Sequence, residues 1–97
     1  MRILQVTLGS GATQVVANQD AVIGGYNIYC SVLIFQNNAS HNVRVGDNTV
    51  TASRGILLNP GGSNTLTVCP PHGTLLSQYY LYGTSGDVID VMYEVSQ

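Results

Sequence analysis

The segment Val88–Val95, with the sequence VIDVMYEV, alternates between two sets of side chains along its whole length. Successive side chains of a β-strand point to opposite faces, so such alternation is typical of a strand that buries one face. The other set contains both acids of the segment, Asp90 and Glu94. The set expected to face the core is Ile89, Val91, Tyr93 and Val95.

Short alternating or apolar runs between turn residues recur along the rest of the chain. No ten-residue window keeps a helical period free of glycine and β-branched clusters. We expect strands at residues 3–8, 13–17, 26–36, 42–45, 49–52, 56–58, 64–69, 78–82 and 88–95. This spacing predicts one all-β domain over residues 1–97, either an antiparallel β-sandwich or a jelly-roll-like small barrel.

Two hairpins are expected from glycine-containing turns. Residues 43–52 are predicted to form one hairpin with Gly46, Asp47 and Asn48 at its tip. Residues 79–93 are predicted to form the other, closed by residues 83–86.

Residues 26–36, with the sequence YNIYCSVLIFQ, are apolar on both expected faces. Such a strand is either central and covered on both sides, or has one face buried by a partner subunit. The two expected sets are Ile28, Cys30, Val32 and Ile34 on one face, and Tyr29, Ser31, Leu33 and Phe35 on the other.

Charged residues make up only 8% of the chain, against about 25% in typical domains. Three scattered arginines and no lysine argue against binding to nucleic acid or to an anionic membrane surface. No apolar run reaches the ~18–20 residues of a transmembrane helix, and residues 1–6 do not resemble a signal peptide. We therefore expect synthesis in a cytoplasm, and a surface with little charge repulsion to keep copies apart.

No residue pattern indicates catalysis, a metal site or a cofactor. Asp90 and Glu94 share a face but lie roughly 13 Å apart along a strand, wider than the carboxylate pairs of glycoside hydrolases. His41 and His72 fall in turn segments without a recognisable nucleophile nearby. Cys30 and Cys69 are expected to be reduced structural thiols, because a cytoplasmic product seldom forms a single distant disulfide.

The remaining candidates are interface residues. Tyr80 and Tyr82 form an outward aromatic pair if Tyr79 and Leu81 face inward, although cross-strand pairing or a sugar-binding platform would use the same residues. The first strand precedes a Gly9-Ser10-Gly11 segment that could act as a hinge, so it could pair with another chain or serve as an ordinary edge strand. The residues predicted to form an interface with another subunit or with a partner protein are Arg2, Ile3, Leu4, Val6, Tyr80 and Tyr82.

Three segments resemble those of small β-rich virion proteins of tailed bacteriophages. They run from Asn42 to Asp47 (NVRVGD), from Ser53 to Ser63 (SRGILLNPGGS) and from Leu81 to Asp87 (LYGTSGD). The resemblance covers roughly residues 35–93 and rests on turn residues more than on chemistry.

The resemblance implies a β-sandwich or jelly-roll-like, non-enzymatic subunit, and short length favours a capsid decoration (cement) protein that binds and stabilises the phage head. The implied partner is the major capsid protein or another virion protein, and the implied location is the virion. A homo-oligomer is expected, with a trimer favoured. The alternatives are a tail or fibre-head component, or a module that binds a carbohydrate or host receptor.

Overall fold

The computed structural model describes residues 1–16, 28–62 and 64–96, and these ranges contain β-strands and one short 3-10 turn. The first strands are β1 (Arg2–Thr7), β2 (Thr13–Gln14), β3 (Tyr29–Gln36), β4 (Val43–Gly46) and β5 (Ile56–Leu58). The others are β6 (Thr65–Val68), β7 (Thr74–Leu75), β8 (Tyr80–Tyr82) and β9 (Val88–Val95), with the 3-10 turn at Leu76–Gln78.

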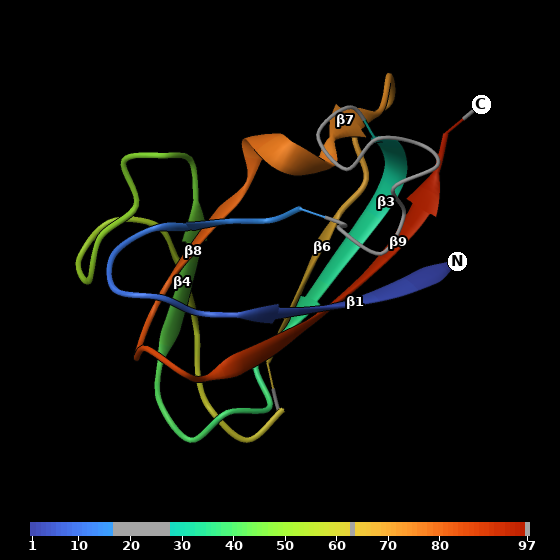
Figure 1. The fold of residues 1–97 in the computed structure, drawn as a ribbon. Coiled ribbons are helices and arrows are strands. Elements are labelled where there is room, and N and C mark those ends of the chain that lie inside the picture. Colours follow the sequence, from blue (N-terminus) through green and yellow to red (C-terminus); the bar gives the residue numbers. More distant parts are fainter. Residues whose placement is uncertain (17–27, 63, 97) are drawn as a thin grey trace.

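The strands form two antiparallel sheets packed face to face, which confirms the predicted all-β sandwich. The five-stranded sheet has the order β1-β9-β3-β6, with β7 also paired to β3, and the four-stranded sheet has the order β2-β8-β4-β5. Figure 1 shows β4 and β8 on one side of the molecule and β1, β9, β3 and β6 on the other. The pairs are nested in sequence, β4 with β5, β3 with β6, β2 with β8 and β1 with β9. Such nesting is the jelly-roll topology, in which consecutive strands pass between two sheets.

The hydrophobic core fills the space between the sheets. The alternation predicted for the last strand is confirmed, since Ile89, Val91 and Tyr93 are fully buried and Val95 packs against the core. The same spacing of two residues selects the buried side chains of the other long strands. Other core residues of the five-stranded sheet are Leu4, Val6, Leu33 and Phe35, and those of the four-stranded sheet are Val43, Val45, Leu58 and Leu81.

A β-bulge in β3 changes the faces expected for that strand. The pairing of β3 with β9 shifts register between Cys30 and Val32, and the extra residue inverts the alternation after it. Cys30, before the bulge, and Leu33 and Phe35, after it, are therefore all buried. Ile34 faces outward and is half-buried. The prediction that Cys30 and Ile34 share a face was wrong. The strand is central in its sheet, between β9 and β6, but its outer face is only half-buried at Ile34, so the described residues do not cover it on both sides.

Both predicted hairpins were wrong. In the first, residues 43–46 do not pair with residues 49–52. The chain after β4 makes a turn in which Val50 N–H donates to the Asp47 carbonyl at 3.0 Å, and only a single bridge, Thr51 to Arg54, lies where a strand was expected. Hydrogen bonds from the Thr49 side chain and backbone lower the pKa of Asp47 and fix this turn. The partner of β4 is β5 instead.

The second hairpin fails because its two strands belong to different sheets. β8 pairs with β2 and β4, and β9 pairs with β1 and β3. Residues 83–87 therefore carry the chain from one sheet to the other. The strand β7 and the 3-10 turn after it were not predicted, while the expected strand at residues 13–17 is described only to residue 16 and pairs over Thr13–Gln14.

Candidate protein-binding surfaces

The predicted interface residues of β1 divide between the inside and the outside of the molecule. Leu4 and Val6 are 4% and 7% exposed and belong to the core, so they are not accessible to a partner in this structure. Arg2 and Ile3 are exposed. The strand pairs with β9 over its whole length, from Arg2 opposite Tyr93 to Thr7 opposite Val88. It is therefore an edge strand of its own sheet.

The Gly9-Ser10-Gly11 segment does not release β1 from the fold. Leu8 N–H donates to the Asp87 carbonyl at 2.8 Å, and Gly86 N–H donates to the Leu8 carbonyl at 2.8 Å. Gly9 N–H donates to the Thr13 hydroxyl at 3.0 Å. These bonds continue the pairing beyond the strand, so the expected hinge is wrong.

The outer face of the five-stranded sheet carries an apolar row made of Ile3, Met92 and Ile34. These residues are cross-strand neighbours, because Ile3 pairs with Met92 and Met92 pairs with Ile34. Ile3 is 65% exposed and Met92 is 37% exposed. Directly opposed side chains on one face of a sheet lie ~4.5–5.5 Å apart at Cβ, so the three form one continuous apolar surface across β1, β9 and β3.

A row of polar side chains borders the apolar row. Gln5, Asp90 and Gln36 are also cross-strand neighbours, and Gln5 Nε2 donates to Asp90 Oδ1 at 3.0 Å. A shallow groove of about 520 Å³ runs along the two rows, with Thr65 of β6 at its far side. An apolar centre beside hydrogen-bonding groups is the arrangement found at many protein interfaces.

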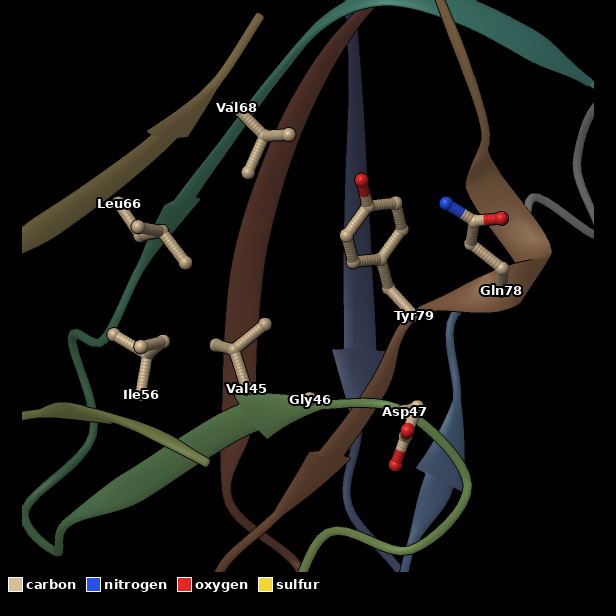
Figure 2. Close-up of a pocket in the computed structure, with 8 residues that line it drawn as sticks. All are labelled: Val45, Gly46, Asp47, Ile56, Leu66, Val68, Gln78 and Tyr79. Atoms are coloured by element: carbon tan, nitrogen blue, oxygen red, sulfur yellow. The ribbon is translucent and has the colours of Figure 1, made fainter. Parts of the chain in front are cut away.

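A second apolar surface is a slot of about 440 Å³ between the two sheets. It opens at the side where β5 and β6 are the outermost strands of their sheets. Figure 2 shows Leu66 and Val68 of β6 on one wall and the ring of Tyr79 pointing into the space, with Gln78 and Asp47 both on the Tyr79 side. The Tyr79 hydroxyl is 2.9 Å from the Thr74 hydroxyl, within hydrogen-bonding distance. The other apolar lining residues are Val45 and Ile56.

Tyr80 and Tyr82 lie on the outer face of the four-stranded sheet and are half-buried. The predicted condition for an outward pair holds, since Leu81 is fully buried and Tyr79 packs against the core. Tyr82 pairs across the sheet with Arg44, which pairs in turn with Leu57. This face therefore combines aromatic, cationic and aliphatic side chains, and it is separate from the apolar row on the other sheet.

The residues considered for catalysis are dispersed. His41 Nδ1 lies 2.9 Å from Asp87 Oδ2, whereas His72 is exposed in the turn after β6. Asp90 accepts from Gln5 and Asn38, and Glu94 pairs with the N-terminal ammonium group at 3.1 Å. Within the described ranges, no group of three or more His, Cys, Asp or Glu residues is placed to hold a metal ion.

The two cysteines are both free thiols, and they differ in burial. Cys30 is fully buried and Cys69 is exposed. Burial raises the pKa of the Cys30 thiol from 9.0 to about 11, because a thiolate is poorly solvated there.

This pKa shift predicts a loss of stability at alkaline pH. Between pH 9 and about pH 11 the unfolded chain releases the Cys30 proton while the native chain keeps it, so stability falls as pH rises through this window. Urea unfolding at pH 8 and pH 10.5 measures the fall in the free energy of unfolding, and this fall should be smaller in a Cys30→Ala variant.

A thiol reagent at pH 8 should label Cys69 in the native protein and Cys30 only after unfolding. Rapid labelling of both thiols would contradict the burial of Cys30.

Sequence reasoning missed Ile34, Met92 and Arg44 as surface residues of interest. Met92 carries a signal, because it is an exposed-face apolar residue between Asp90 and Glu94 in an alternating strand. Ile34 carries none, since only the bulge turns it outward. The slot walls come from strands far apart in the sequence, so no local pattern marks them.

Comparison with known proteins gives no match to any protein-family model, curated protein or solved structure. In the described part of the chain, no helix is long and apolar enough to cross a membrane.

Proposed function

We propose that the protein is a non-enzymatic structural subunit of a virion, and that it decorates the outside of a bacteriophage head by binding the major capsid protein or another virion protein. The observation that carries this proposal is the exposed apolar row Ile3, Met92 and Ile34 on a sheet with few charges. Exposed apolar rows bordered by polar groups are typical of surfaces that bind protein.

The fold and the sequence resemblance support the same class of function. The jelly roll occurs in viral capsid domains and also in lectins, so the fold alone does not choose a function. The three segments that resemble phage virion proteins lie in and around β4, β5 and β8, at the four-stranded sheet. Homo-oligomerisation, with a trimer favoured, is part of the proposal and stays a prediction.

Co-sedimentation with empty phage capsids that lack the protein tests the proposal. The protein should pellet with capsids and Ile3→Asp should weaken binding by about tenfold or more, because a carboxylate would be desolvated at the contact. Salt should change the wild-type affinity little, since the apolar row contains no charge.

Leu57→Asp is the matched control, because Leu57 is 41% exposed on the outer face of the opposite sheet. It should pellet like the wild type. Equal loss of binding in both variants would exclude the apolar row as the specific contact, and a wild-type protein that never pellets would contradict the decoration function.

A further inference from the structure

A hollow of about 370 Å³ with a mixed polar and apolar lining lies on the outer face of the four-stranded sheet, at the end where β8 leads into residues 83 and 84. Its volume falls within the range of small-molecule sites, about 300–1,000 Å³. The side chains that define it are His41, Asn42, Arg44, Leu57, Tyr82 and Thr84. Four of these carry hydrogen-bonding groups besides the arginine, so the hollow differs from the apolar slot between the sheets.

Arg44 is held in place by the neighbouring loop. Its Nε donates to the Ala52 carbonyl and its Nη1 donates to the Gly55 carbonyl, both at 2.9 Å. Two of the five guanidinium N–H groups are thereby used, which leaves three for other acceptors. Within the described ranges, no carboxylate forms an ion pair with Arg44. A fixed guanidinium with free donors is suited to binding a carboxylate.

Gly55 shows that this loop conformation is specific. Its φ is +131°, and a Cβ atom there would lie 2.9 Å from the Val45 carbonyl oxygen and 2.8 Å from a Val50 methyl group. Only glycine fits without a shift. The close contacts around Gly55 therefore fix the position of its carbonyl group, which accepts the hydrogen bond from Arg44 Nη1.

The other lining side chains that carry hydrogen-bonding groups are Tyr82, His41, Asn42 and Thr84. Tyr82 is the cross-strand neighbour of Arg44, and both side chains line the hollow. His41 precedes Arg44 in the chain and lines the same hollow. Its Nδ1 lies 2.9 Å from Asp87 Oδ2, and this contact restrains the imidazole ring. Asn42 and Thr84 add an amide and a hydroxyl group.

We propose that this hollow binds an acidic sugar of the hexuronate class. Its carboxylate would pair with Arg44, one face of the pyranose ring would pack on Tyr82, and ring hydroxyl groups would bond to His41, Asn42 and Thr84. An aromatic surface beside several hydrogen-bonding groups is complementary to a sugar, which has apolar C–H faces and a polar edge. A peptide carboxylate fits less well, because only Leu57 and Ala52 supply aliphatic lining for its flanking side chains. The proposal does not depend on a role in a virion.

Titration with methyl β-glucuronide and methyl β-glucoside, followed by NMR of the ¹⁵N-labelled protein, tests the proposal. The two probes share a ring and differ in the carboxylate, so the glucuronide should bind about tenfold or more tightly. Shifted amide signals should map to residues 41–44 and 82–84. Equal affinity for both sugars, or shifts that map elsewhere, would overturn the site. Acetate that binds as tightly as the glucuronide would show a carboxylate site with no sugar specificity, which also overturns it.

The variants Arg44→Gln and Arg54→Gln separate the local charge from the net charge. Each removes one positive charge, but Arg54 does not line the hollow and its Nε donates to the Thr49 hydroxyl instead. Arg44→Gln should weaken glucuronide binding about tenfold or more, and Arg54→Gln should stay within about twofold. Equal losses in both variants would refute the assignment. If Arg44→Gln does not fold, Tyr82→Ala is the deciding variant. An unchanged glucuronide affinity in Tyr82→Ala would show that the sugar does not pack on the Tyr82 ring, which would refute the proposal.

Discussion

Deletion of residues 1–8 is expected to abolish cooperative folding. The deletion removes Leu4, Val6 and Leu8, which are 4%, 7% and 2% exposed. Truncating one buried leucine to alanine costs about 2–5 kcal/mol, and the total stability of a domain is about 5–15 kcal/mol. The deletion also removes the six paired positions of β1 and leaves β9 as an unprotected edge.

Circular dichroism during urea unfolding measures this effect. The full chain should unfold in one sigmoidal transition, and the deletion variant should show none. Leu4→Ala and Ile3→Ala form the matched pair within the full chain, because the two residues are neighbours in β1 and only Leu4 is buried. Leu4→Ala should lose about 2–5 kcal/mol and Ile3→Ala less than about 1 kcal/mol. A deletion variant that folds cooperatively would show that β1 is a detachable arm.

Asn37→Ala is expected to destabilise the protein by about 3–5 kcal/mol, although it removes only one small polar side chain. Asn37 is fully buried at the end of β3. Its Nδ2 donates to the Leu58 carbonyl at 3.0 Å and to the His41 carbonyl at 2.8 Å. Its Oδ1 accepts from Ala39 N–H at 3.0 Å. Because Leu58 belongs to β5, this amide joins the two sheets.

The large cost follows from what the substitution leaves behind. Alanine would leave the buried Leu58 carbonyl, and the partly buried His41 carbonyl and Ala39 N–H, without these hydrogen bonds. A buried polar group without a partner costs about 1–3 kcal/mol. Asn38→Ala is the control, since the neighbouring Asn38 is exposed and its amide bonds to Asp90 and Gln36 at the surface. It should lose less than about 1 kcal/mol. Equal urea midpoints for the two variants would show that water replaces the bonds of Asn37.

The candidate surfaces could be predicted from the sequence only where alternation was unbroken. In β9 the pattern VIDVMYEV assigns each residue to a face, and the buried positions Ile89, Val91 and Tyr93 follow it. The same reasoning places Tyr80 and Tyr82 outward, as the structure has them. It failed in β3, because a single extra residue between Cys30 and Val32 inverts every later face and leaves no mark in the composition.

The class of fold and the low charge of the surface follow from local and compositional properties of the chain. Strand-like alternation, frequent turn residues and 8% charged residues are local or compositional properties, and they do not depend on which strands meet. The nested pairing, the burial of Leu4 and Val6, and the hollow around Arg44 can be seen only in the folded molecule. Those features arise from contacts between residues far apart in the chain, such as β1 with β9, and such contacts are selected by packing of the whole core rather than by any local pattern.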